Sequence, residues 1–183
     1  MSTEYWLYLI IGLVVFNYLF STVLDFINDK NWKDEIPPLM KDYYDEEKYV
    51  KAKNYAKEKG RISLISSTLS TVITILFLVF KGYGWLDSII ANYYDIPFLQ
   101  SGLFFLTLFI LSDFISIPFS CYNTFVIEEK YGFNKTTVKT FVIDKIKGYV
   151  LTLTIGGGLL AASLYLVSIL VNGFWLWLWI GLS

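Results

Sequence analysis

Residues 62–80 read ISLISSTLSTVITILFLVF, and this stretch decides what kind of fold the chain can adopt. It contains no charged residue. An α-helix rises about 1.5 Å per residue, so a stretch of 19 residues extends roughly 28 Å, close to the thickness of the hydrocarbon layer of a bilayer. We therefore predict that residues 62–80 form a membrane-spanning helix.

Three further apolar runs are long enough to span, at residues 5–27, 98–124 and 148–171. A fifth run, FWLWLWIGLS at residues 174–183, has about half the length that a span needs. The sequence thus predicts an all-α integral membrane protein, a polytopic helical bundle with four full transmembrane helices and a truncated fifth. We expect the chain to be a fragment of a longer protein.

Composition agrees with a bilayer as the solvent and limits the chemistry of the chain. Of its 183 residues, 55% are hydrophobic and 17% are charged, whereas an average soluble domain has about 25% charged residues. The net charge of -1 leaves no overall basic character for nucleic acid. Histidine is absent and Cys121 is the single cysteine, so imidazole bases, HExxH zinc sites and disulfides are all excluded. We expect neither catalytic nor metal-binding residues in this chain.

Lysine and arginine are distributed unevenly among the connections between the runs. Nine lie between the first and second runs and five between the third and fourth, whereas the second connection holds only Lys81. Positively charged loops stay in the cytoplasm. We predict cytoplasmic loops at residues 28–61 and 125–147 and an external N-terminus.

Aromatic residues cluster near the predicted outer ends of the runs. Such clusters anchor helices at the membrane surface. The residues that we assign to this belt are Tyr5, Trp6, Tyr8, Trp85, Tyr93, Tyr94, Trp175, Trp177 and Trp179.

Each cytoplasmic loop contains a predicted helix boundary. In the first loop, Pro37-Pro38 stops the preceding helix. Asp42 or Asp45 then caps a charged helix up to Arg61, which we expect to lie along the protein or membrane surface. In the other loop, Gly132 is placed to end a helix in the left-handed conformation. Asn134 or Thr136 is placed to cap the next helix.

The segment IPFSCYNTFVIEEKYGFNKTTVKTFVIDKIKGYVL, residues 117–151, resembles the signature region of the N-terminal membrane domain of Ste24-type CAAX prenyl proteases. These are membrane-embedded zinc metallopeptidases of the M48 family. A KAxxY-like helix at Lys51, Ala52 and Tyr55 extends the resemblance, which covers the chain loosely from residue 1 to 183. The positions that match the signature are Pro118, Tyr122, Asn123, Phe125, Glu128, Glu129, Lys130, Gly132, Phe133, Asn134 and Asp144.

The resemblance implies a membrane domain that frames an intramembrane chamber. In that family a separate catalytic domain, absent from this chain, holds zinc through HExxH and a downstream Glu. The implied partners are the bilayer, the C-terminal catalytic domain and peptide or prenylated protein substrates. The alternative is a stand-alone membrane protein, acting as a transporter subunit, channel element or assembly factor.

Three acidic residues have more than one interpretation. For Glu128 and Glu129 we favour packing and ion pairing over direct substrate contact, and both over catalysis. Asp113 lies inside the third run, where an ionisable group faces a partner or a water-filled cavity. Its side chain is expected either to bond hydroxyls such as Ser70, Thr71 or Thr74 or to line the chamber.

The ratio of 14 Lys to one Arg leads us to expect a bacterial inner membrane more than the endoplasmic reticulum.

Overall fold

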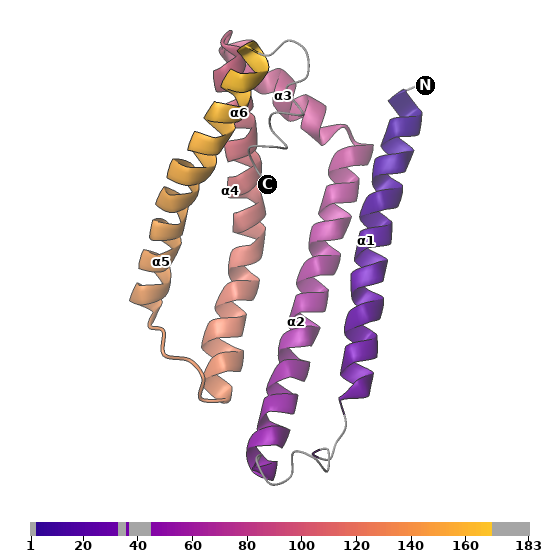
Figure 1. Cartoon of the computed structure of the whole chain (residues 1–183), viewed down its shortest axis with the longest axis vertical. Coiled ribbons are helices and arrows are strands. Elements are labelled where there is room, and N and C mark those ends of the chain that lie inside the picture. The colour runs from indigo at the N-terminus through magenta and orange to yellow at the C-terminus, as the bar shows by residue number, and fades with distance from the viewer. Residues whose placement is uncertain (1–2, 33–35, 37–44, 170–183) are drawn as a thin grey trace. The chain divides into compact units, whose positions relative to one another are not determined.

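The structure is a computed structural model of the chain, and it describes residues 3–32, 36 and 45–169 (Figure 1). The regular elements in these ranges are all helical, which confirms the predicted all-α fold. They are α1 (Thr3–Asn31), α2 (Glu46–Val79), α3 (Gly82–Tyr93), α4 (Pro97–Tyr122), the π-helical η2 (Asn123–Glu128), α5 (Val138–Leu151), the π-helical η3 (Thr152–Gly156) and α6 (Gly157–Ile169).

Four helical segments of the described chain are long and apolar enough to cross a membrane, which confirms the four predicted full spans. They cover residues 4–31, 46–79, 97–128 and 138–167. The predicted fifth helix at residues 174–183, with Trp175, Trp177 and Trp179, lies outside the described residues, as do Pro37-Pro38 and Asp42.

Most apolar side chains on these helices are exposed, which suits a protein whose surface is covered by lipid. The belt residues of the described part follow this pattern: Tyr5, Trp6, Tyr8, Trp85, Tyr93 and Tyr94 are all exposed. Among the described residues, the buried apolar side chains are Ile36, Leu86, Ile90, Ile127 and Tyr131.

The chain divides into two compact units. Unit 1 contains Met1–Trp85 and Ile110–Lys135, and unit 2 contains Leu86–Phe109 and Thr136–Ser183. In unit 1, α1 packs beside α2 (Figure 1). Thr68 donates its hydroxyl to the carbonyl of Leu64, 2.6 Å away, so Tyr18 of α1 is the donor in the 2.8 Å bond between its hydroxyl and that of Thr68. In unit 2, the rings of Phe109 and Tyr149 meet edge to face, with centroids 6.0 Å apart.

The predicted surface helix of the first loop is wrong as a separate element. Residues 46–61 are instead the first half of α2, which runs on without a break into the span. Gly60 does not end the helix, because a glycine inside a helix costs only about 1 kcal/mol relative to alanine and removes no hydrogen bond. Asp45 is the N-cap, as predicted, and its side chain accepts the Glu47 amide at 2.9 Å. The charged part before Ile62 therefore extends the spanning helix beyond its apolar part.

The second predicted loop contains only a short non-helical segment. The helix of α4 and η2 continues to Lys130, and α5 begins at Val138, so only residues 131–137 of the predicted loop 125–147 are non-helical. The N-cap of α5 is Thr137, not Asn134 or Thr136. The Thr137 hydroxyl accepts a hydrogen bond from the backbone amide of Thr140 at 3.2 Å, three residues later, as the side chain of an N-cap residue does. The Asn134 side chain instead donates to Glu129 at 2.9 Å.

Between the second and third runs lies α3, a helix of 12 residues that was not predicted from the sequence. Lys81, with a φ of 55°, turns the chain between α2 and α3. Leu86 and Ile90 of α3 are buried and lie one helical turn apart. The spacing of these two apolar residues is the signal from which a helix could have been predicted.

The orientation in the membrane stays a prediction and can be measured by cysteine labelling. In a background carrying Cys121→Ser, single cysteines at Lys53 and Lys135 are expected to be protected from an impermeant thiol reagent in intact cells. A cysteine at Ser88 is expected to react, because the Lys and Arg distribution places that connection outside. External labelling of Lys53→Cys and Lys135→Cys would reverse the predicted topology.

Candidate functional site at the turn after the third span

Part of the signature segment lies where the end of the third span meets the charged half of α2, within unit 1. We call this group the turn cluster. It consists of Lys51, Tyr55, Glu58 and Lys59 from α2 and Ile127, Glu128, Lys130, Tyr131, Gly132 and Phe133 from the other side.

The turn itself is a complete helix C-cap. Gly132 has a φ of +71°, as predicted from its place after the helix. The Phe133 amide donates to the Glu128 carbonyl at 2.8 Å, and the Gly132 amide donates to the Glu129 carbonyl at 3.0 Å. This bond pair is the Schellman motif, which satisfies the last carbonyls of a helix and needs a left-handed residue. The backbone around Glu128 is thus held by local hydrogen bonds.

Aromatic rings fill the contact between α2 and the turn. The ring of Tyr55 meets Tyr131 with centroids 5.6 Å apart and Phe133 with centroids 4.9 Å apart, both edge to face. Each such pair is worth about 0.5 to 1.5 kcal/mol beyond the area that it buries. Ile127 of η2 is only 2% exposed. Tyr55 is therefore the residue of α2 that packs most directly on the turn.

A first polar network joins Glu58 of α2 to the turn. The Glu58 carboxylate accepts the ammonium of Lys130 and, at 3.0 Å, the hydroxyl of Tyr131. The bond from Glu58 raises the pKa of Lys130. Burial, and then the same carboxylate, raises the pKa of Tyr131. At neutral pH Lys130 is therefore cationic, and Tyr131 keeps the proton that it donates.

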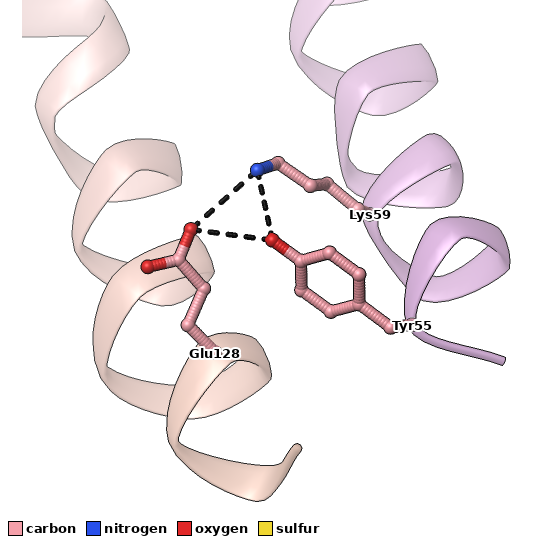
Figure 2. A network of polar contacts seen from close by, with 3 residues as sticks. All are labelled: Tyr55, Lys59 and Glu128. Carbon is pink, nitrogen blue, oxygen red and sulfur yellow. Dashed lines mark hydrogen bonds and ion pairs between the residues drawn. The ribbon is translucent and has the colours of Figure 1, made fainter. Parts of the chain in front are cut away.

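A second network joins Glu128 of the turn to α2 (Figure 2). Lys59 Nζ lies 3.1 Å from the Tyr55 hydroxyl, and both groups lie 3.5 Å from Glu128 Oε1. Lys59 also lies over the Tyr55 ring, 5.3 Å from its centroid. In the same way Lys51 lies 5.5 Å from the centroid of Phe133. Cations thus cover the outer faces of the rings that pack the turn.

The remaining predicted positions are distributed along the chain. Pro118 lies inside α4, Tyr122 is the last residue of α4, and Asn123 and Phe125 belong to η2. Asp144 is in unit 2 and pairs with Lys147 at 3.6 Å. Asp144 is therefore not a member of the turn cluster. The roles assigned to these positions stay predictions.

Asp113 is half-buried in α4, and its backbone carbonyl accepts the hydroxyl of Ser116 at 2.9 Å. One of its expected partners, Thr74, donates its hydroxyl to the carbonyl of Ser70 at 2.9 Å. Whether Asp113 lines a chamber stays a prediction.

Glu58 and Lys59 were not predicted as site residues, because their charges fit a solvated helix equally well. A signal was present in their spacing. Lys51, Tyr55 and Lys59 recur every four residues, and Glu58 follows Tyr55 by three, so all four lie on one face of a helix. An aromatic residue in the middle of such a charged face indicates a packed partner.

Comparison with known proteins agrees with the resemblance of the signature segment. Residues 25–183 match the family model described as CAAX prenyl protease N-terminal, five membrane helices. Over 142 residues the chain is 36% identical to the probable CAAX prenyl protease 1 of Schizosaccharomyces pombe, covering 70% of this chain and 29% of that protein. It is 31% identical to the human CAAX prenyl protease 1 homolog over 174 residues, covering 89% of this chain and 36% of that protein.

A solved structure has a similar fold. The crystal structure of S. mikatae Ste24p superposes with a TM-score of 0.82 at 27% sequence identity, covering 97% of this chain and 42% of that chain. The chain therefore spans about a third of the length of the curated relatives described above.

These findings also bear on where the protein resides. The helices and the family establish a multi-pass integral membrane protein. The relatives come from yeasts and human, so the predicted bacterial inner membrane is not supported. With a family match over residues 25–183, the chain belongs to the N-terminal membrane domain family of the CAAX prenyl proteases.

Proposed function

We propose that this chain is the part of a CAAX prenyl protease-like zinc metalloendopeptidase that frames its intramembrane chamber. The observation that carries the proposal is the turn cluster, in which Glu128, Lys130 and Phe133 of the signature segment contact the charged half of α2. Two ion pairs and two ring contacts are more than a simple connector between two spans needs. They hold the end of the third span in a fixed position, as the wall of a chamber requires.

The catalytic zinc of such an enzyme would be bound outside this chain. Within residues 3–32, 36 and 45–169, no three His, Cys, Asp or Glu side chains are close enough to hold a metal ion. The chain also has no histidine, and catalytic zinc sites are built mostly from His with Cys or carboxylates. The residues present do not fit a zinc site, so we assign no catalytic step to them. Their role is to position the chamber and the polypeptide that enters it.

The substrate class comes from the relatives, which are named CAAX prenyl proteases. We infer that the complete protein would cleave peptides that end in a prenylated CAAX sequence. The family match gives no separate support to a transporter subunit, a channel element or an assembly factor.

This function can be tested on the product of the whole gene that encodes this chain. The purified full-length protein is expected to contain one zinc per molecule and to release the C-terminal tripeptide from a farnesylated CAAX peptide. Chelation should abolish the cleavage, and the 183-residue chain purified without a tag should show neither zinc nor cleavage. A full-length protein without metal or peptidase activity, or one tightly bound zinc in the isolated chain, would contradict the proposal.

A further inference from the structure

The three carboxylates around the turn differ in how well their oxygens are bonded. Glu58 accepts the Lys130 ammonium and the Tyr131 hydroxyl, and Glu129 accepts the Asn134 side-chain amide at 2.9 Å. Glu128 has two longer contacts, both of 3.5 Å and both on Oε1. A distance of 3.5 Å lies beyond the usual range of strong hydrogen bonds, so Glu128 is the most weakly held of the three.

The second oxygen of Glu128 is available for a further bond. Figure 2 shows this oxygen directed away from Lys59 and Tyr55. It accepts no hydrogen bond from any residue in the described part of the chain. The side chain is nevertheless only 27% exposed. An ionised carboxylate has about four acceptor positions. Glu128 thus has unused acceptor capacity on an oxygen that a ligand can still reach.

The backbone of Glu128 is fixed more firmly than its carboxylate. Its carbonyl accepts the Phe133 amide at 2.8 Å and the Asn134 amide at 3.1 Å. Its neighbour Ile127 is buried against α2. A rigid backbone that presents an under-bonded side chain is the arrangement of a pre-positioned binding group.

The charges around Glu128 decide what kind of donor fits. Lys59 already compensates the negative charge, and Lys51 lies over the nearby Phe133 ring. A second cation at Glu128 would be repelled by Lys59. A neutral N–H donor gains a charge-assisted hydrogen bond without that repulsion. Peptides in an extended conformation carry such donors as unpaired backbone N–H groups.

We propose that Glu128 Oε2 binds a backbone N–H of an extended peptide substrate, and that Lys59 and Tyr55 position its carboxylate for this contact. The proposal rests on the proposed peptidase function. Glu128 is a binding residue, and Lys59 and Tyr55 are positioning residues that act through it.

The test uses the full-length protein and compares Glu128→Gln, Glu128→Ala and the control Glu46→Gln. Glutamine keeps a carbonyl acceptor but loses the charge, so we expect KM to rise about threefold. Alanine removes the acceptor, and we expect KM to rise about tenfold with kcat unchanged. Glu46 is an exposed acid at the start of α2, and its replacement should leave both constants unchanged.

A second measurement changes the substrate instead of the enzyme. Peptides in which one amide N–H at a time is replaced by an ester oxygen should reveal one position where wild-type KM rises about tenfold. At that position the ester should not raise the KM of the Glu128→Ala enzyme any further. A purely structural role of Glu128 would not produce this coupling.

The outcomes separate this proposal from the proposed function. Peptidase activity in the wild type, combined with an unchanged KM in Glu128→Ala or for every ester peptide, would overturn the role of Glu128 alone. An equal rise in KM for Glu128→Gln and Glu128→Ala would indicate that Glu128 binds a cationic group. That result would also overturn the proposal of a neutral N–H donor. A wild-type protein that cleaves no peptide would overturn the proposed function itself.

Discussion

Replacing Ile127 with alanine is expected to lower the free energy of unfolding by about 2 to 5 kcal/mol, the largest loss for any single truncation near the turn. Ile127 is 2% exposed, which makes it the most deeply buried side chain of the described residues. It lies in η2, which packs against α2. Truncation would leave a cavity between η2 and α2, because the backbone of the turn is held in place by its own hydrogen bonds.

Thermal unfolding of the purified chain in detergent would measure this effect. The matched control is Val126→Ala, which shortens the neighbouring aliphatic side chain, 46% exposed. Surface substitutions of this kind usually change stability by less than about 0.5 kcal/mol. Equal losses for the two variants would show that the η2 contact with α2 contributes little to stability.

The second large effect is expected for Gly132→Val. Gly132 has a φ of +71°, a conformation that β-branched residues avoid at a cost of about 1 to 3 kcal/mol. Space is not the obstacle. A Cβ at this position would meet only the Lys51 ammonium, at 3.8 Å, among the described residues. The expected loss therefore arises from backbone strain in the Schellman turn and not from a steric clash.

Two controls isolate the strain. Gly132→Asn should retain most of the stability, because asparagine tolerates the left-handed conformation better than other residues. Lys135→Gln changes an exposed side chain in the same connection and should have almost no effect. In the full-length protein, Gly132→Val should reduce peptidase activity more than membrane insertion. Wild-type turnover and stability in this variant would mean that the turn is an ordinary connector.

The fold class and the number of full spans could be predicted from the sequence because lipid imposes a local rule. A backbone in the hydrocarbon layer must satisfy its own hydrogen bonds, so an apolar run of sufficient length is a helix whatever its neighbours are. Residues 62–80 show this rule directly. The left-handed turn at Gly132 could be predicted for an equally local reason. A glycine that follows the last turn of a helix commonly adopts the left-handed conformation.

The helix boundaries were predicted less well, because propensity does not decide them. The charged segment before Arg61 was expected to be a separate surface helix, but it continues through Gly60 into the span. A glycine costs about 1 kcal/mol. Packing along α2 and the turn cluster offsets a cost of that size.

The sequence alone determined that this chain is a helical membrane domain of a particular family, because span length, charge asymmetry and the signature segment are all properties of neighbouring residues. Only the tertiary structure showed that Tyr55 and Lys59 meet Glu128, about 70 residues away, and that Glu58 meets Lys130. Such pairs depend on the register between two antiparallel helix ends. That register is set by the burial of Ile127 and the ring contacts of Tyr55, and no local pattern encodes it.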